Sequence, residues 1–375
     1  MVDLQGQYQR SKTAIDDAIS EVLESTAFIN GPAVGHFADE LASYNGVNHV
    51  VPCANGTDAL QIAMMALDLK PGDEVIVPCF TYVATAEVIA LLGLTPVFVD
   101  VDPETFMVLP EEVEKSITPK TKAVVPVHLF GQCADMEGLL AVAERHSIYI
   151  IEDTAQAIGA EYTFQDGSSK KAGTIGTIGT TSFFPSKNLG CFGDGGALFV
   201  QDTELAKKTK MIANHGQRVK YHHDIVGINS RLDTMQAAIL RVKLKQLDAY
   251  IANRNRSANF YDKAFTGLAS ISLPVRAPQS THVFHQYTIK CNGFDREELR
   301  TFLERKGVPT MVYYPVPLHL QKAYSGYGYG KGDFPVSEML TEQVLSLPIH
   351  TEQQESELIY ITEAVKEFLA TNGLK

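Results

Sequence analysis

Cysteine is scarce in this 375-residue sequence, and its arrangement excludes two common kinds of site. No two of the five cysteines have the C-x-x-C spacing of a zinc site, and their odd number and wide separation do not suit a disulfide framework. Basic residues are also few, with 32 Lys and Arg against 44 Asp and Glu and a net charge of −12. Because so acidic a surface repels a phosphate backbone, we expect no nucleic-acid partner, although a local pocket for a small anion stays compatible with it.

Long apolar runs are missing as well. The most apolar stretch, residues 88–101, is too short to span a membrane and contains Gly93 and Pro96. The first twelve residues, MVDLQGQYQRSK, lack the basic patch and apolar run of a secretion signal. Together with the unpaired thiols, these features predict a soluble cytoplasmic protein with no membrane partner.

What the sequence does contain is a globular composition, with 45% hydrophobic and 20% charged residues, and a regular alternation between residues 48 and 200. Short apolar runs occur at 49–53, 74–79, 96–101, 122–127, 148–151, 180–184 and 197–200, and segments with helical spacing lie at 59–67, 84–92, 111–117 and 136–146. Strands that are apolar at nearly every position and are joined by helices predict a parallel sheet covered on both faces. We therefore expect an α/β fold that binds its ligand at the carboxyl ends of the strands.

The last third of the chain predicts a second, smaller unit. A long helical stretch runs from about Leu232 to residue 265, and the first 25 residues also form a helix, which the loop 29–32 follows. Further on we expect strands at 286–290 and 310–314 and helices at 296–306 and from about residue 355. At roughly 150 residues per domain, the length fits two domains. We place a large α/β domain at 1–255 and a small α+β domain at 256–375.

Two carboxylates, Glu152 and Asp153, stand just past a buried strand, where a charge needs a partner. Asp153 has two possible roles. It caps a helix that starts at Ala155, or it faces a bound cation such as the protonated ring nitrogen of a cofactor.

The stretch Cys53-Ala-Asn-Gly-Thr-Asp58 follows another predicted strand and opens a helix. Gly56 lets a ligand approach the backbone and Thr57 supplies a hydroxyl, while the free N–H groups of the first turn attract an anion. Asn, Thr and Asp are also ordinary N-cap residues, so simple capping is the alternative.

The most informative stretch is Ser182-Phe-Phe-Pro-Ser-Lys187-Asn-Leu-Gly-Cys-Phe-Gly193-Asp-Gly195-Gly196. A strand runs into a Pro-containing turn that ends at Lys187, and a glycine-rich segment leads into the next strand. Most lysines are solvated surface groups. A lysine among Phe, Pro and Gly residues is more often partly desolvated, which lowers its pKa and frees a nucleophilic amine.

Four other patterns have a structural interpretation beside a functional one. Val99-Asp-Val-Asp102 resembles a D-x-D metal motif, but it precedes Pro103, which favours a turn, and we expect no metal site. The glycines of residues 173–179 lack the spacing of a dinucleotide fingerprint. His128 is either a base or a hydrogen-bonded structural residue, and Tyr82 is either a core aromatic or a stacking platform.

The order of these features is more specific than any one of them. An anion-binding helix start, an aromatic residue, a strand-end aspartate, a serine and a lysine all follow strands of one predicted sheet. Pyridoxal 5'-phosphate requires this set, because its phosphate suits a helix N-terminus, its ring an aromatic face, its nitrogen a carboxylate and its aldehyde a lysine. The sequence therefore predicts a pyridoxal phosphate site.

The sequence resembles the DegT/DnrJ-type sugar aminotransferases, pyridoxal phosphate enzymes of the aspartate aminotransferase-like fold (fold type I). The resemblance runs from the first helix to the last. It is carried by Asn55–Leu60, Phe80–Glu87, Glu152–Gln156, Ser182–Lys187 with Gly193–Gly196, Gly227–Asp233 and Tyr314–Leu318. It implies a large domain with a mostly parallel sheet and a smaller C-terminal α+β domain.

The resemblance also implies a role for each matched residue. Lys187 would bind the cofactor covalently and transfer the proton, and Asp153 would keep the pyridine nitrogen protonated. The other cofactor-binding residues would be Gly56, Thr57 and Ser182 at the phosphate, Tyr82 on the ring, Gln156 near the ring hydroxyl, and Asn229 of a second subunit at the phosphate. Arg231, Tyr313 and Tyr314 would contact the sugar. A site shared in this way requires a homodimer.

Within this family, lysine at position 187 favours transamination, because a related sugar dehydratase carries histidine there. Residues 79–87 and 182–187 look most like the branch that aminates UDP-linked 2-acetamido-3-oxo-glucuronate with L-glutamate as donor, for surface polysaccharides such as O-antigen. At Tyr313 some relatives carry histidine, which leaves a dTDP-linked 3-keto-6-deoxyhexose as the alternative substrate. A pyridoxal phosphate lyase or dehydratase and a catalytically silent regulator are alternatives on the same fold.

Overall fold

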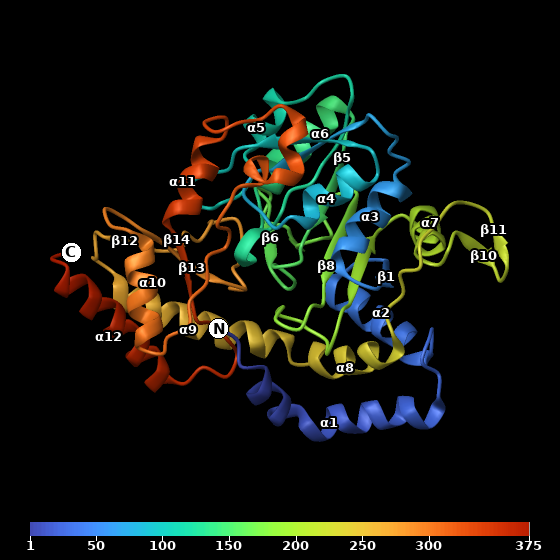
Figure 1. Cartoon of the computed structure of the whole chain (residues 1–375). Helices are drawn as coiled ribbons and strands as arrows, with labels where there is room; N and C mark the ends of the chain where they lie inside the picture. Colours follow the sequence, from blue (N-terminus) through green and yellow to red (C-terminus); the bar gives the residue numbers. More distant parts are fainter. Residues whose placement is uncertain (375) are drawn as a thin grey trace.

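The computed structural model describes residues 1–374 and is built on a seven-stranded sheet in the order β1-β9-β8-β5-β4-β2-β3 (Figure 1). The strands are β1 (His49–Cys53), β2 (Glu74–Pro78), β3 (Thr95–Val99), β4 (Thr121–Val124), β5 (Tyr149–Asp153), β8 (Ile178–Ser182) and β9 (Gly196–Val200). All seven predicted runs form strands, and the expected mostly parallel sheet is confirmed. Only β9 runs antiparallel to its neighbours β1 and β8, because residues 183–195 return the chain from β8 without a crossover helix.

Helices cover both faces of this sheet, because successive strand residues point to opposite sides. Val75 and Val77 of β2 pack in one core with α3 (Gly56–Ala66), α4 (Ala84–Leu91) and α7 (Thr203–Ala213). Ile76, between them, packs in a second core with α5 (Pro110–Lys115) and α6 (Met136–His146). Near β9, α2 (Pro32–Asn45) and α8 (Thr234–Leu244) cover the face opposite α3. The predicted two-sided burial is confirmed.

The predicted helical stretch 232–265 is two helices, α8 and α9 (Leu247–Phe265), separated at Lys245–Gln246. Figure 1 shows them in one row below the sheet, with α1 (Leu4–Ser25) beneath α8. Continuous apolar periodicity hides so short a break, since both helices keep their apolar side toward the protein. Residue 255, where we divide the two domains, lies inside α9, and that division stays a prediction.

The C-terminal part contains a small antiparallel sheet with a core of its own. Strands β12 (Ile271–Ser272), β13 (Tyr287–Cys291) and β14 (Val344–Leu347) pack against α9, α10 (Arg296–Arg305) and α12 (Glu355–Thr371). The expected strand at 310–314 is wrong, since Met311 makes only a single bridge, to Ser346. Its β-forming residues, Val312 to Tyr314, instead pack against the core of the large sheet.

Residues 315–343 form a strap that returns from the small sheet to the large one. The strap contains the short helices η2 (Leu318–Leu320) and η3 (Lys322–Tyr327) and helix α11 (Pro335–Gln343). Its residues Leu318, Tyr324 and Phe334 are buried in the core that also holds α3 and α4. The strap therefore anchors the C-terminal part on the large sheet.

Asp100 and Asp102, the pair that resembles a D-x-D motif, have structural roles. Asp100 accepts hydrogen bonds from the Val336 and Ser337 backbone N–H groups and so caps α11. Asp102 accepts from the backbone N–H of Thr105 within its own turn. The turn interpretation is confirmed.

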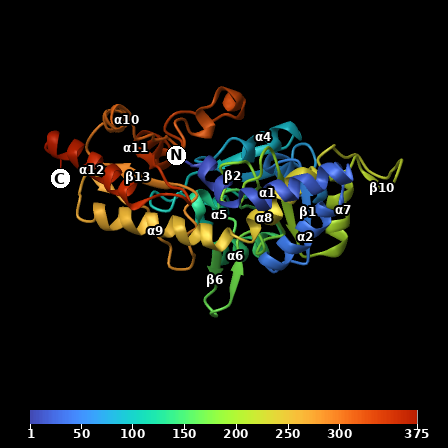
Figure 2. The ribbon, with the colours of Figure 1, turned by 90° about the horizontal axis from the view of Figure 1, so that it is seen from below.

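Two hairpins project from the body, β6 (Glu161–Thr163) with β7 (Ser169–Lys171) and β10 (Gln217–Val219) with β11 (His222–His223). Figures 1 and 2 agree that the β10–β11 hairpin lies at the end of the molecule opposite the small sheet. Among residues 1–374, no helix has both the length and the apolar character needed to cross a membrane.

Candidate active site

The candidate site is built from segments that leave parallel strands at the same edge of the sheet. β1 leads into α3, β2 leads to Tyr82, β5 ends at Asp153, and β8 ends at Ser182 just before Lys187. Because these four strands share one direction, their carboxyl ends lie together. This brings segments that are far apart in the sequence to one place.

The start of α3 and the end of β8 approach each other closely. A Cβ atom added at Gly56 would lie 2.7 Å from the Cβ of Ser182, so only glycine allows this approach. Asn55 caps the helix by accepting a hydrogen bond from the Asp58 N–H at 2.8 Å, which confirms the capping alternative for that residue. The first-turn N–H groups at Gly56 and Thr57 have no partner within the helix. Together with the hydroxyl groups of Thr57 and Ser182, these N–H groups fit a phosphate group.

Asp153 is buried, with 8% of its surface exposed. Its Oδ1 accepts a hydrogen bond from the Ala155 N–H at 3.0 Å, and its Oδ2 accepts one from the Thr85 hydroxyl at 3.3 Å. Burial raises the pKa of Asp153, and the nearby Lys187 charge acts against this rise. No helix begins at Ala155, where residues 155–159 form turns, so the helix-cap alternative is wrong.

Glu152 and His128 form a separate, structural pair. The Glu152 carboxylate is fully buried and accepts hydrogen bonds from the backbone N–H groups of Gly173, Ile175 and Gly176 at 2.5–2.8 Å. His128 accepts from the Ala134 N–H at its Nδ1 atom, and its Nε2 lies 2.9 Å from Glu152. Gly173 and Gly176 thus belong to a loop around a carboxylate, Gly179 lies within β8, and His128 has the hydrogen-bonded structural role.

Lys187 is half-buried at the end of the turn that follows β8, where its backbone N–H donates to the Phe184 carbonyl at 2.8 Å. Burial lowers the pKa of Lys187 to about 8, and the carboxylate of Asp153 acts against this decrease. At pH 7 about a tenth of the amine is then uncharged, far more than for a lysine with the ordinary pKa. This is the state that attacks an aldehyde.

Aromatic residues line another side of the site. Tyr82 has 57% of its surface exposed, which excludes the core alternative and leaves a ring face free for stacking. Its ring centroid lies 6.3 Å from that of Tyr314, and the Tyr313 ring lies 5.9 Å from Tyr314. The Gln156 amide donates to the Tyr314 hydroxyl at 3.0 Å and accepts from the Phe130 N–H at 2.8 Å. Gln156 is therefore held in place beside these rings.

Asn229 and Arg231 lie in the segment that precedes α8, and Arg231 faces a groove of its own. Asn229 is exposed, and the Ser230 hydroxyl accepts a hydrogen bond from the Ala54 N–H at 3.0 Å. Arg231 lines a groove of about 740 Å³ whose lining includes no residue of the Lys187 site. The groove also carries three other cations, Lys207, Lys210 and Arg218. Arg231 of the same chain therefore lines a separate groove and not the Lys187 site.

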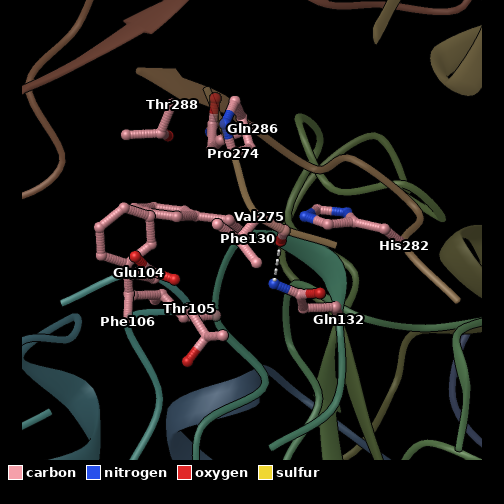
Figure 3. Close-up of a pocket in the computed structure, with 11 residues that line it drawn as sticks. Glu104, Thr105, Phe106, Phe130, Gln132, Pro274, Val275, His282, Gln286 and Thr288 are labelled. Atoms are coloured by element: carbon pink, nitrogen blue, oxygen red, sulfur yellow. Dashed lines mark hydrogen bonds between the residues drawn. The ribbon is translucent and has the colours of Figure 1, made fainter. Parts of the chain in front are cut away.

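His285 and Gln286, which precede β13, were not identified by sequence reasoning. His285 is 5% exposed and lies close enough to Lys187 for the lysine charge to depress its pKa. Figure 3 shows Gln286 at the edge of a small pocket between the two sheets, together with Phe130 and His282. The pocket has a volume of about 10 Å³, which leaves room for one water molecule at most. Nothing in the local pattern marks His285, because its position relative to Lys187 depends on how the two parts of the chain pack.

Comparison with known proteins shows one consistent family. The DegT/DnrJ/EryC1/StrS aminotransferase family matches residues 9–366. The chain is 47% identical over 349 residues to the UDP-2-acetamido-2-deoxy-3-oxo-D-glucuronate aminotransferase of Pseudomonas aeruginosa, covering 93% of this chain and 94% of that protein. It is 45% identical to a pleiotropic regulatory protein of Geobacillus stearothermophilus (98% of each chain) and 42% identical to the dTDP-3-amino-3,4,6-trideoxy-alpha-D-glucose transaminase of Streptomyces venezuelae (98% and 95%).

Solved structures agree with this assignment. The S. venezuelae DesV protein, crystallised with a ketimine intermediate, superposes with a TM-score of 0.94 at 42% identity, covering 98% and 97% of the two chains. The NtdA protein of Bacillus subtilis, solved with the bound cofactor PMP, superposes with a TM-score of 0.89 at 34% identity, covering 96% and 82%. The expected fold type, the aminotransferase assignment and the pyridoxal phosphate cofactor of the family are confirmed. This chain is a member of the DegT/DnrJ/EryC1/StrS aminotransferase family and a sugar aminotransferase.

Proposed function

We propose that this enzyme transfers the amino group of L-glutamate to a UDP-linked 3-oxo sugar of the 2-acetamido-3-oxo-glucuronate type. The products are 2-oxoglutarate and the 3-amino sugar nucleotide, so the exchange needs no external oxidant or reductant. The observation that carries the aminotransferase chemistry is the placement of Lys187, with its lowered pKa, near the buried Asp153. The sugar assignment is supported by the 47% identity to the P. aeruginosa enzyme that acts on this type of sugar.

The residues at the strand ends would hold pyridoxal phosphate, which supplies an aldehyde that exchanges amino groups and a ring that accepts an electron pair. The α3 start at Gly56 and Thr57, with the Ser182 hydroxyl, would bind the phosphate. Tyr82 would stack on the ring, and Gln156 would lie near its hydroxyl. These assignments rest on the close approach of Gly56 to Ser182 and on the exposed ring of Tyr82.

Lys187 and Asp153 would have different roles in the handling of protons. The Lys187 amine would take the proton from the substrate carbon in one half of the exchange and return it in the other, since its pKa of about 8 lies near neutral pH. Asp153 would hold a proton on the ring nitrogen, and the Thr85 hydroxyl and Ala155 N–H would orient its carboxylate. A cationic ring nitrogen would lower the pKa of this buried carboxylate and keep it ionised.

The proposed enzyme is a homodimer in which Asn229 and Arg231 of a second copy complete the site. In one chain Arg231 lines a groove that includes no residue of the Lys187 site, and this groove gathers cations in a protein of net charge −12. Such a groove suits an anionic sugar nucleotide or the surface of a second copy. Tyr313 and Tyr314, which stand beside Gln156, would contact the sugar.

The five free, buried cysteines suit the reducing cytoplasm, where we place this reaction, as a step toward surface polysaccharides such as O-antigen. The resemblance to a pleiotropic regulatory protein keeps the silent-regulator alternative testable. An enzyme is favoured over a regulator because Lys187, Asp153 and the proposed phosphate-binding start of α3 all follow strands at the same edge of the sheet.

The first test is the visible absorbance of protein incubated with pyridoxal phosphate, before and after addition of L-glutamate. We expect an absorbance band that depends on Lys187 and that disappears when glutamate is added. The same reaction should release one 2-oxoglutarate per site. A band that glutamate leaves unchanged would favour the lyase or dehydratase alternative. Binding of the cofactor without turnover of glutamate or of any sugar nucleotide would favour the regulator.

The second test follows the glutamate-treated protein with two acceptors, UDP-2-acetamido-3-oxo-glucuronate and a dTDP-linked 3-keto-6-deoxyhexose. We expect the UDP sugar to restore the band at the higher kcat/KM. A preference for the dTDP sugar would replace the UDP assignment with the substrate class of the S. venezuelae relative, to which the chain is 42% identical. The glutamate half of the exchange would stand in either case.

A further inference from the structure

The side chain of Tyr314 contacts segments that follow two different strands of the large sheet. Its ring centroid lies 6.3 Å from that of Tyr82, which follows β2, and its hydroxyl meets the amide of Gln156, which follows β5. In the sheet, β4 separates these two strands. Tyr314 directly precedes the strap, so it brings the C-terminal part of the chain over the strand ends that form the candidate site.

The amide of Gln156 has one allowed orientation. The backbone N–H of Phe130, which can only donate, lies 2.8 Å from the amide oxygen, so the amide nitrogen is the group that faces Tyr314. This nitrogen donates to the Tyr314 hydroxyl at 3.0 Å. Phe130 and Gln156 are both buried. Exchange of the two amide ends would set the Phe130 N–H against an NH2 group, and a buried donor without an acceptor is costly.

The direction of this bond determines what the Tyr314 hydroxyl can do. A hydroxyl that accepts a hydrogen bond at its oxygen keeps its own hydrogen for another acceptor. The bond from Gln156 is the one hydrogen bond of this hydroxyl among residues 1–374. Burial raises the pKa of Tyr314, so the hydroxyl keeps its proton near neutral pH. Tyr314 therefore presents a neutral donor beside the exposed ring of Tyr82.

We propose that Gln156 is a positioning residue that sets Tyr314 as a hydrogen-bond donor to an oxygen of the bound ligand. The oxygen belongs either to the ring of the cofactor or to the keto sugar, since an ionised ring oxygen and a keto oxygen are both acceptors. Because these ligands are those of the proposed function, the proposal rests on that function. This action of Gln156 through Tyr314 is separate from any direct contact of Gln156 with the cofactor.

A double-mutant cycle tests the direction of the bond. In Gln156→Glu the carboxylate still accepts from the Phe130 N–H, but it can only accept from Tyr314, so the hydroxyl hydrogen turns toward it and away from the ligand. We expect Tyr314→Phe to weaken ligand binding about tenfold in the wild-type background and less than about twofold in the Gln156→Glu background. The added charge is common to both proteins of the Gln156→Glu background and cancels from their comparison.

The readouts are two dissociation constants. The first is that of pyridoxal phosphate, measured by visible absorbance. The second is that of each of the two keto sugar nucleotides named above for the cofactor-loaded protein, measured by calorimetry. If the ligand oxygen belongs to the cofactor, the two backgrounds differ with pyridoxal phosphate alone. If it belongs to the sugar, they differ only with a sugar nucleotide.

Tyr313→Phe is the matched control, because the hydrogen bond from Gln156 is made to the neighbouring Tyr314. Its cost should be the same in both backgrounds, and the thermal midpoint monitors folding in every variant. If Gln156→Glu does not fold, Gln156→Met takes its place. Loss of the amide leaves the Tyr314 hydroxyl without a fixed direction, so Tyr314→Phe should again cost less than in the wild-type background.

An equal cost of Tyr314→Phe in both backgrounds, for the cofactor and for both sugar nucleotides, would overturn the proposal. No cost of Tyr314→Phe in the wild-type background would overturn it as well. If the wild type binds these ligands but does not exchange amino groups with glutamate, the proposed function fails. The dissociation constants need no turnover, so they still test Gln156 in that case.

Discussion

Glu152 and Asp153 are consecutive residues of β5 whose carboxylates face opposite environments. Glu152 is surrounded by backbone N–H groups of the 173–176 loop and by His128, and Asp153 lies toward Thr85 and Lys187. This follows from the alternation of side chains along a strand. One carboxylate is thereby assigned to the fold and the other to the candidate chemistry.

The two carboxylates should respond differently to loss of charge. In Asp153→Asn we expect the cofactor to stay bound while turnover falls by about 10² or more, because the ring nitrogen loses the partner that keeps it protonated. In Glu152→Gln we expect a loss of about 1.5–3 kcal/mol in the free energy of unfolding, since hydrogen bonds to a buried charge are replaced. Urea unfolding and single-turnover rates separate the two effects. Near-normal turnover of Asp153→Asn would refute the assignment.

Lys187 can be tested against a matched lysine. Lys243 of α8 is also buried, with its pKa lowered to about 8, but its amine donates to the Gly190 carbonyl. We expect Lys187→Ala to abolish the glutamate-dependent absorbance change and Lys243→Met to retain it in whatever fraction folds. Retention of full transamination by Lys187→Ala would remove the central residue of the proposed mechanism.

The lowered pKa of Lys243 should also make the stability of the protein depend on pH. Burial lowers its pKa from 10.5 to about 8 in the folded protein, so between these values the unfolded chain binds more protons. The free energy of unfolding therefore gains from this group as pH rises from 8 to 10.5, by about 3 kcal/mol in all. Subtracting the curve of Lys243→Met from that of the wild type isolates the effect. A flat difference would show that the lysine is not desolvated in solution.

A buried chain of hydrogen bonds joins the strap to the end of β2. The Cys79 sulfur lies 2.8 Å from His319 Nδ1, and His319 Nε2 lies 3.1 Å from the Glu338 carboxylate. Burial raises the pKa of Cys79 to about 12, so its thiol donates to the imidazole. Cys79→Ala leaves His319 Nδ1 without a donor, and we expect it to cost about 1–3 kcal/mol in stability.

Two other cysteine variants serve as controls for this chain. Cys79→Ser keeps a donor and should lose less stability than Cys79→Ala. Cys291→Ala removes a thiol that is buried in the small core, with no side-chain hydrogen bond among residues 1–374, and should show only the packing loss. Chemical denaturation of the three variants gives the comparison. An equal loss in Cys79→Ala and Cys79→Ser would mean that the hydrogen bond contributes nothing.

The proposed second copy at the site can be tested by complementation. Asn229→Ala should weaken cofactor retention, and Lys187→Ala should abolish turnover. If Asn229 acts across the subunit interface, a mixed dimer of the two variants contains one site with both changes and one intact site. We expect the co-refolded variants to regain activity above the sum of the two variants measured alone. No recovery in a verified mixed dimer would place both residues in the same chain's site.

Much of the architecture was predictable because it depends on local pattern. The seven strands follow from β-branched apolar runs, and α6 matches its predicted bounds, 136–146, because a capping Asp135 and a regular apolar spacing define it. The prediction of a strand at 310–314 was wrong because Tyr313 and Tyr314 pack against the core of the large sheet instead. The β-propensity of a segment does not show which part of the protein the segment will pack against.

The sequence by itself determined the α/β class, the family and the residue types of the site. Asp153, Ser182 and Lys187 stand in short continuous motifs at the ends of strands, and such motifs can be read without the structure. Tertiary structure alone decided which carboxylate lies toward Thr85 and Lys187, that Tyr82 is exposed, and that His285, from a distant segment, is buried where the Lys187 charge lowers its pKa. The reason is physical: burial at these positions arises from packing between segments that are far apart in the sequence, and no local pattern encodes which of them will meet.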